Sequence, residues 1–211
     1  MADSPFTSAF VEHLRFLIQQ HHILYPAVAP FGTLFESLVD RAFRATELVP
    51  ADVVRTTPNV PREDIVVLGG RISIKTETGV GTKPNRISIT KLCTTERDPW
   101  DQRVLVQRAL GHLAQYEDIL MLRAIWPGQG QIHYQLLDVP VALLRRMEIV
   151  ALEPVGKRVT RQSLAGYVLE GNDRLFRVRF DGTDGKCQIQ ELRVDRCHML
   201  REWDHYITPG Q

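Results

Sequence analysis

The sequence predicts an α/β (α+β) fold in which a central mixed β-sheet is flanked by helices and followed by a β-rich C-terminal subdomain. Two N-terminal stretches place apolar residues at helical spacing, and residues 63–93 alternate apolar and polar side chains. From residue 149 onward, short β-like runs alternate with turns rich in Gly, Asn and Asp. The predicted order is helices, strands, a helix and further strands. This order is typical of helices layered on a sheet.

The first two elements are expected to be amphipathic helices. Residues 5–24 carry an apolar stripe at helical spacing, made of Phe10, Leu14, Leu17 and Ile18. Residues 30–46 form a second helix whose expected buried stripe is Phe31, Leu34, Phe35, Leu38 and Ala42. Prolines at positions 50, 58 and 61 predict a loop over residues 48–62.

A hairpin and a further strand follow. In the stretch EDIVVLGGRISIKTETG, residues 63–79, two apolar runs flank a Gly-Gly turn, which is typical of a β-hairpin. RISITKLC, residues 86–93, alternates as a strand after the polar loop VGTKPN. Asp98 and Pro99 predict the start of a helix that runs to about Tyr116, because aspartate caps helices and proline suits their first position.

The remaining elements are strands at 118–126 and 131–139, a short helix VALLRRM, and the C-terminal strands. This pattern divides the chain into residues 1–148, with the N-terminal helices and the central sheet, and residues 149–211, a β-rich and basic subdomain. Residues 155–201 hold ten Lys and Arg against six acidic residues. Such an excess is expected either on a solvated charged face or on a surface that contacts phosphate.

Composition excludes some classes of protein. The 211 residues are 44% hydrophobic and 24% charged, which is ordinary for a globular protein. No secretory signal is recognisable, and no apolar run approaches the roughly 18 residues of a membrane span. Three widely spread cysteines are expected to be reduced thiols, so we expect a cytoplasmic protein that does not enter a membrane.

The hairpin also carries the residues with the clearest chemistry. Side chains alternate along a strand, so Ser73, Lys75 and Glu77 share one face, with Asp64 across the hairpin. Carboxylates bind Mg²⁺, a hard cation that prefers oxygen ligands. A bound metal lowers the pKa of water and neutralises phosphate charge, and a lysine can stabilise the same charge. These residue types together are a minimal kit for phosphodiester hydrolysis.

In this arrangement the chain resembles the PD-(D/E)xK phosphodiesterase superfamily, most closely the type II restriction endonucleases. The resemblance covers about residues 30–140 and includes the Asp64 strand, the SIK strand, ISITKL, the helix from 99 and the strand DILMLRAIW, in the family's order. It implies a restriction-endonuclease-like core whose central sheet these strands complete. Arg-Glu-Asp stands in place of the motif's Pro-Asp, and Ser73 occupies the position of the second acid.

The resemblance implies specific roles. Asp64 takes the place of the first motif acid and would bind Mg²⁺, and Lys75 takes that of the motif lysine and would position the attacking water. Either Glu77, on the same strand face, or Glu36, on the preceding helix, would supply the second carboxylate. The structural alternatives are a solvated acid at Asp64, a surface pair of Lys75 and Glu77, and an ordinary helix-surface acid at Glu36.

The implied function is a Mg²⁺-dependent endonuclease that hydrolyses phosphodiester bonds at a specific double-stranded DNA sequence, as in a restriction-modification system. The alternatives are a non-catalytic DNA-binding protein on a decayed nuclease core and a repair or structure-specific nuclease of the same superfamily. The expected DNA contacts are basic or polar residues of two loops, namely Lys83, Asn85, Arg86, Lys157, Arg158 and Arg161. Arg177 and Arg179 are expected to point away from the core of their strand.

A homodimer is expected, because one site of this type cuts one strand and two-fold symmetry supplies the second cut. The apolar stripe of the first helix, from Phe10 to Ile18, is the candidate for part of its interface.

Overall fold

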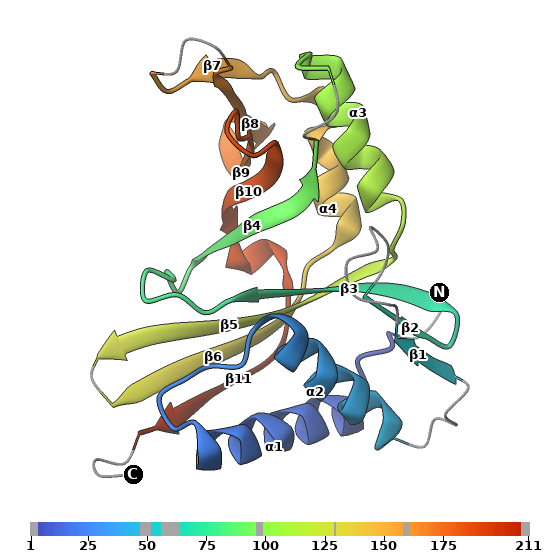
Figure 1. Cartoon of the computed structure of the whole chain (residues 1–211), viewed down its shortest axis with the longest axis vertical. Helices are drawn as coiled ribbons and strands as arrows, with labels where there is room; N and C mark the ends of the chain where they lie inside the picture. The colour runs from blue at the N-terminus through green and yellow to red at the C-terminus, as the bar shows by residue number, and fades with distance from the viewer. Residues whose placement is uncertain are drawn as a thin grey trace. The chain divides into compact units, whose positions relative to one another are not determined.

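The structure is a computed structural model that describes residues 4–46, 52–55, 64–95, 99–128, 130–157 and 161–207. The described residues form four α-helices and eleven strands that make two sheets (Figure 1). Two compact units are interleaved along the chain. Unit 1 consists of residues 1–82, 116–139 and 198–211, and unit 2 consists of residues 83–115 and 140–197. The predicted α+β class with a central mixed sheet is confirmed, and the predicted division at residue 149 stays a prediction.

Unit 1 is built on a six-stranded mixed sheet with the order β1-β2-β3-β5-β6-β11. Its strands are β1 (Val53–Arg55), β2 (Ile65–Val67), β3 (Gly70–Glu77), β5 (Asp118–Gly128), β6 (Gln131–Asp138) and β11 (His198–Tyr206). The pair β3 and β5 is parallel, and every other neighbouring pair is antiparallel. Strand β1 lies in the stretch that the prolines predicted as a loop, so that prediction was wrong for residues 53–55.

Helices α1 (Ser8–Leu24) and α2 (Gly32–Arg44) cover one face of this sheet (Figure 1). Thr7 caps α1 through its side chain, which accepts a hydrogen bond from the amide of Phe10. The predicted stripes pack against alternate strand residues such as Ile72, Ile74 and Leu122. The other face of β3 therefore carries Ser73, Lys75 and Glu77.

Burial of the α1 stripe overturns one prediction about the homodimer. Phe10, Leu14, Leu17 and Ile18 are between 0% and 7% exposed and belong to the hydrophobic core. The helix needs this stripe to hold its own sheet, so the stripe cannot form an interface with a second chain. In α2, Phe35, Leu38 and Ala42 are buried as predicted, whereas Phe31 and Leu34 are exposed.

The predicted hairpin is β2–β3, but its turn residues are Leu68 and Gly69 rather than the two glycines. Gly70 already pairs with Val67 in the ladder. Both turn residues have positive φ, 51° at Leu68 and 82° at Gly69, as a two-residue type I′ turn requires. This turn fixes the register that sets Asp64 opposite the start of β3.

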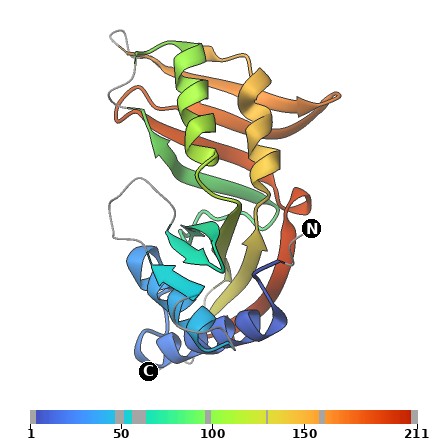
Figure 2. The same cartoon turned by 90° about the vertical axis from the view of Figure 1, so that its right-hand side faces the viewer.

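Unit 2 contains a five-stranded antiparallel sheet with the order β4-β10-β9-β8-β7. Its strands are β4 (Arg86–Thr94), β7 (Glu153–Val155), β8 (Ser163–Glu170), β9 (Asp173–Phe180) and β10 (Lys186–Arg193). Helices α3 (Gln102–Leu113) and α4 (Val141–Arg145) lie on one face of it (Figure 2). Two 3₁₀ segments, η2 (Arg146–Ile149) and η3 (Val194–Arg196), complete the unit.

Two predictions for this region need correction. Strand β4 was expected to belong to the central sheet, but it pairs with β10 in the sheet of unit 2, so β3 and β4 are not hairpin partners. Helix α3 is capped by Asp101, whose side chain accepts hydrogen bonds from the amides of Arg103 and Val104. The predicted cap, Asp98, lies outside the described residues.

Cys93 and Cys187 are buried cross-strand neighbours, and all three cysteines are free thiols. The hydrogen bond with Cys93 and burial raise the pKa of the Cys187 thiol well above its ordinary value. Within the described residues, no helix has the length and apolar character that crossing a membrane requires.

Candidate active site

Asp64 lies immediately before β2, where the hairpin holds it beside β3. Its amide donates a hydrogen bond to the carbonyl of Ile72 at 3.0 Å. Its carboxylate Oδ2 accepts hydrogen bonds from the Ser73 hydroxyl, at 3.1 Å, and from the amide of Ile74. These bonds hold the carboxylate in one orientation, and its side chain keeps 27% exposure to solvent.

Lys75 joins the same cluster from the next outward position of β3. Its Nζ donates to the Ser73 hydroxyl at 2.7 Å and to the carbonyl of Ile74 at 3.2 Å, and it lies 3.7 Å from Asp64 Oδ2. The Lys75 side chain is 20% exposed. The two residues predicted to be central to the chemistry are therefore in contact, on a surface that solvent reaches.

Ser73 occupies the position of the second motif acid and is only 2% exposed. Its hydroxyl donates to Asp64 and accepts from Lys75, so it connects the two charged groups. A carboxylate at this position would place a second negative charge beside Asp64. The serine keeps the Asp64–Lys75 pair nearly neutral and supplies an oxygen instead of a charge.

Glu77 lies two residues further along the same strand face and is held by a residue that the sequence reading missed. Arg123 of β5 is fully buried, and its Nε donates to Glu77 Oε2 at 2.8 Å. The Arg123 guanidinium also donates to Gln135 Oε1. A buried arginine needs a carboxylate partner, so Glu77 already has a structural role. The signal for it was a single arginine within the apolar run DILMLRAIW.

Glu36 of α2 is engaged elsewhere in unit 1. Its Oε2 accepts from Arg55 at 3.3 Å, and Arg55 also donates to the Ser37 hydroxyl at 2.9 Å. In the described part of the chain, no three Asp, Glu, His or Cys side chains gather as a metal site would require. The roles of Glu77 and Glu36 stay predictions.

A second group of acids, not anticipated from the sequence, lies on the β5 side of β3, where Asp118 pairs with Ile72 and Asp138 pairs with Leu120 of β5. Burial, followed by the charges of Asp138 and Glu117, raises the pKa of Asp118. Burial also raises the pKa of Asp138, while a hydrogen bond from His198 at 3.1 Å opposes that shift. Asp138 Oδ1 is buried without a hydrogen-bond partner in the described residues. Because their pKa values are raised, Asp118 and Asp138 take up a proton at a higher pH than an ordinary aspartate does.

The predicted DNA contacts belong to two places in the chain. The loop with Lys83 and Asn85 leads into β4, and the Asn85 carbonyl accepts a hydrogen bond from the amide of Val194 at 3.3 Å. Arg86 pairs in register with Arg193 of β10. These positions surround one edge of the unit 2 sheet.

The second place is the connection between β7 and β8. Lys157 is exposed, and Arg158 lies outside the described residues. The Arg161 guanidinium stacks over the ring of Trp100, 3.9 Å from its centroid. The assignment of all six residues as DNA contacts stays a prediction.

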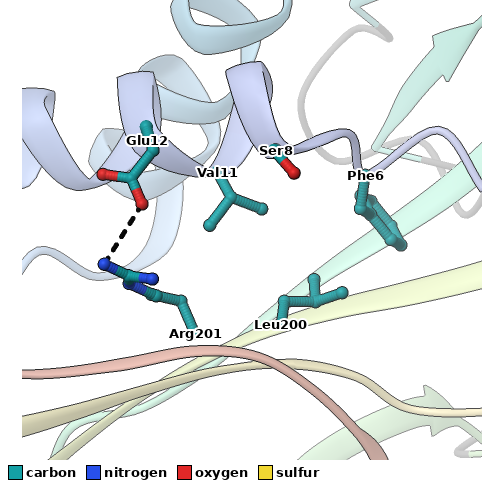
Figure 3. A pocket seen from close by; sticks show the side chains of 6 residues that line it. All are labelled: Phe6, Ser8, Val11, Glu12, Leu200 and Arg201. Carbon is teal, nitrogen blue, oxygen red and sulfur yellow. Dashed lines mark ion pairs between the residues drawn. The ribbon is translucent and has the colours of Figure 1, made fainter.

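A small pocket in unit 1 lies between the start of α1 and β11 (Figure 3). Arg201 and Glu12 form an ion pair across it, with 3.3 Å between Nη2 and Oε1. Its lining is Phe6, Ser8, Val11, Glu12, Leu200 and Arg201. None of these residues belongs to the Asp64–Lys75 cluster.

Comparison with known proteins identifies relatives of the whole arrangement. The SmaI family of type II site-specific deoxyribonucleases matches residues 4–205. The type II restriction enzyme SmaI of Serratia marcescens is 28% identical over 180 residues, which are 84% of this chain and 72% of that enzyme. A solved restriction endonuclease in complex with substrate DNA aligns at 22% identity with a TM-score of 0.36, over 71% of this chain and 72% of its own. The family match extends over both units and includes the Asp64–Lys75 cluster, and the chain therefore belongs to the SmaI family of type II restriction endonucleases, which are site-specific DNA endonucleases.

Proposed function

We propose that this endonuclease is Mg²⁺-dependent, cleaves at one specific double-stranded DNA sequence, and uses Asp64 and Lys75 for catalysis. The observation that supports this proposal best is the cluster in which Lys75 Nζ lies 2.7 Å from the Ser73 hydroxyl and 3.7 Å from Asp64 Oδ2. Holding a lysine beside an aspartate on a half-buried strand face costs free energy, because the side chains lose rotamer freedom and part of their hydration. A catalytic role is a reason for the protein to keep such a pair.

Restriction enzymes of this type use a divalent metal, and the residues of the cluster fit Mg²⁺. Asp64 offers a carboxylate that is partly exposed, and Oδ1 takes part in none of the hydrogen bonds that orient Oδ2. Mg²⁺ in phosphoryl-transfer sites is typically held by one or two carboxylates together with water and phosphate oxygens. Glu77 or Glu36 would supply the second carboxylate. The metal, when bound, lowers the pKa of water and neutralises charge on phosphate.

In this proposal, Lys75 acts on the attacking water and on the phosphate that is cleaved. Its Nζ is held by two oxygen acceptors, the Ser73 hydroxyl and the Ile74 carbonyl, so its position is fixed before DNA binds. From that position the ammonium can orient the attacking water and stabilise the charge that develops on the phosphate. Asp64 keeps the ammonium in place by its charge.

The test is cleavage of phage DNA in the presence of Mg²⁺ by the wild type and by Lys75→Ala. The wild type should give discrete fragments. Lys75→Ala should lose cleavage by at least about 100-fold and keep its affinity for DNA, because the lysine acts on the transition state more than on the ground state. The matched control is Lys91→Ala, which removes an exposed lysine of β4. Cleavage by Lys75→Ala at the control's rate would refute the role of Lys75.

Two alternative functions remain distinguishable by experiment. A decayed, non-catalytic core would bind DNA with an affinity that does not change when Mg²⁺ or Ca²⁺ is added, and Ser73 at the acid position is the observation that favours it. A repair or structure-specific nuclease would cleave flaps, mismatches or branches and leave intact duplex uncut. The family match favours site-specific cleavage over both alternatives.

The predicted DNA contacts form part of this proposal. Lys83, Asn85 and Arg86 at the start of β4, and Lys157, Arg158 and Arg161 between β7 and β8, would meet phosphate. A protein that loses one phosphate contact loses about one unit of slope in a plot of log affinity against log salt. Lys157→Ala is the cleanest variant, because Lys157 is exposed whereas Arg161 also stacks on Trp100. An unchanged slope for Lys157→Ala would exclude that contact.

We also propose that the enzyme acts as a homodimer in the cytoplasm, with an interface different from the α1 stripe. Seven large apolar side chains between residues 16 and 34 are 42% to 75% exposed: Phe16, Ile23, Leu24, Tyr25, Val28, Phe31 and Leu34. An exposed apolar patch of more than a few hundred Å² marks an interaction surface, and a standard interface buries roughly 800 Å² on each partner. These seven residues lie close together in the sequence, and we propose that they supply part of such a patch.

The geometry of α1 supports this surface. Phe16 and Ile23 lie on the side of α1 opposite to the buried stripe, since seven residues are about two helical turns, and Leu24 lies at the margin of that side. A helix that is apolar on both sides is normally buried on both. Sedimentation at micromolar concentration should show a dimer for the wild type and a monomer for Leu24→Glu. A wild type that stays monomeric with and without DNA would refute the dimer.

A further inference from the structure

The sheet of unit 2 has one face that the described helices leave uncovered. Helices α3 and α4 lie on the other face (Figure 2), and the strand residues Phe176, Val178 and Phe180, which alternate toward that covered face, are fully buried. Arg177 and Arg179 consequently point to the uncovered side, as the sequence predicted. We call this side, formed by β8, β9 and β10, the outer face.

Register aligns long polar side chains across the three strands of the outer face. Arg177 pairs with Tyr167 of β8 and with Gln190 of β10, and Arg179 pairs with Gln188. Arg177 Nη1 donates to Gln190 Oε1 at 3.4 Å, and Gln190 Nε2 donates to Gln188 Oε1 at 3.1 Å. Each of these side chains is only partly exposed, because the neighbours pack against one another. An ordinary solvated face would not hold its side chains in such a connected row.

A strained residue adds a carboxylate to this row. The ladder between β10 and β4 shifts register between Ile189 and Leu192, and Glu191 in this bulge has φ 58°. A non-glycine residue in the left-handed region costs free energy, so its persistence needs a reason. The bulge sets Glu191 beside Tyr167, whose hydroxyl donates to the carboxylate at 3.3 Å. Bulges of this kind commonly redirect a side chain next to a functional site.

The arginines of the outer face are held in place by neighbouring side chains. The Arg174 guanidinium lies over the Tyr167 ring, 4.2 Å from its centroid. Arg179 Nη2 donates to the Ser163 hydroxyl at 3.3 Å and to Asp181 at 3.2 Å. Arg179 Nε is buried and has no hydrogen-bond partner in the described residues. A buried donor without a partner is uncommon in a folded protein.

We propose that the outer face reads base edges in the major groove of the target duplex, through Arg177, Arg179, Gln188, Gln190 and Glu191. This inference rests on the proposed sequence-specific cleavage and assigns the residues responsible for it. Arginine forks match the two acceptors of guanine, glutamine matches the donor and acceptor of adenine, and a glutamate accepts from cytosine. Sheets serve as readers of this kind in several DNA-binding proteins.

The chemistry of the row separates it from the predicted phosphate contacts. Phosphate needs only positive charge, which lysines in loops supply, and such contacts position the protein without carrying sequence information. The outer face combines donors with acceptors in fixed positions, which phosphate does not need. Its rigidity also reduces the entropy lost on binding, so one arrangement of base edges is favoured over the others.

The experiment begins with wild-type digestion of phage DNA and sequencing of the fragment ends, which identifies the site. Cleavage is then measured on a duplex with that site and on duplexes with each base pair changed. Arg177→Lys keeps a long, positively charged side chain but removes the forked guanidinium. Gln190→Met keeps the length of the side chain but removes its amide. The matched control, Arg145→Lys, changes an exposed arginine of α4 on the covered side of the sheet. Thermal unfolding of each variant establishes that it is folded.

For Arg177→Lys and Gln190→Met, kcat/KM on the cognate duplex should fall between about 5-fold and about 150-fold, the range for one bidentate base contact. Discrimination should weaken at one base-pair position, while affinity for site-free DNA and the salt slope remain those of the wild type. Equal losses on every duplex, or no loss in either variant, would overturn the inference. If the wild type itself gives no discrete fragments, the proposed sequence-specific cleavage is refuted. If the wild type is specific and both variants keep its full discrimination, only the role of the outer face is refuted.

Discussion

His22 should make the stability of unit 1 depend on pH. This residue of α1 is 4% exposed, and its ring stacks on His205 of β11 with 3.7 Å between centroids. Its Nδ1 donates to the carbonyl of Tyr25 at 3.1 Å, which leaves Nε2 to accept from the Tyr134 hydroxyl at 2.8 Å. Burial, followed by the charge of His205, lowers the pKa of His22 from 6.5 to about 4.

A lowered pKa means that the folded state prefers neutral His22, while the unfolded chain binds a proton below about pH 6.5. The stability contributed by neutral His22 is therefore complete above pH 6.5 and is lost as the pH falls toward 4. The linkage relation gives a loss of about 2 kcal/mol between pH 7 and pH 5, and about 3 kcal/mol once the pH is below 4.

Urea unfolding followed by tryptophan fluorescence measures this effect, and one of the three tryptophans, Trp203, stacks on Tyr134, 5.0 Å away, beside His22. His22→Gln removes the titrating group and keeps a side chain that can hydrogen-bond. The free energy of unfolding should fall by about 2 kcal/mol more in the wild type than in His22→Gln between pH 7 and pH 5. His13→Gln, a half-buried position of α1 outside the stack, is the control. The same pH dependence in His22→Gln and wild type would refute the reasoning.

Three further outcomes are expected. Leu68→Asn should raise the free energy of unfolding by about 1 kcal/mol in urea titrations, because asparagine tolerates the positive φ of this turn better than leucine. Glu77→Gln should lower it by about 3 kcal/mol, because the change leaves the charge of Arg123 buried without a carboxylate; if Glu77→Gln is as stable as the wild type, the ion pair is not structural. Asp118→Asn should raise stability at pH 7, measured by thermal unfolding, because burial raises the pKa of Asp118 and an amide carries no charge there. A lower melting temperature for Asp118→Asn would show that the charged carboxylate is needed.

Local patterns were sufficient to predict that Asp64 and Lys75, the central pair of the candidate site, lie side by side. Apolar alternation and a turn signal predicted the β2–β3 hairpin, and a hairpin necessarily brings Asp64 close to Lys75. Ser73 was recognised as a departure from the motif, but its bridging hydroxyl was not predicted, because a hydrogen bond depends on side-chain positions that alternation does not define.

Features that depend on distant parts of the chain were not predictable in the same way. The partner of Glu77 follows from the register of β3 with β5, 46 residues further along the chain. Strand β4 has the alternation of any half-buried strand, and nothing in its own residues says which sheet it joins. Phe31 and Leu34 were expected in the buried stripe of the second helix but are exposed. A spacing of 3.6 residues shows that an apolar stripe exists but not which of its members reach the core.

The interleaved order of the two units has a consequence for how the protein is made. Strand β11 completes the sheet of unit 1 by pairing with β6, yet every residue of unit 2 is synthesised before β11 begins. Until then β6 has an open edge, which is a template for pairing with other chains. At roughly 5–20 residues per second, translation of residues 140–197 keeps that edge open for about 3 to 12 seconds. Synonymous codons in this segment therefore set how long the nascent chain is exposed to misassembly, and so how much folded enzyme a cell obtains from the same amino-acid sequence.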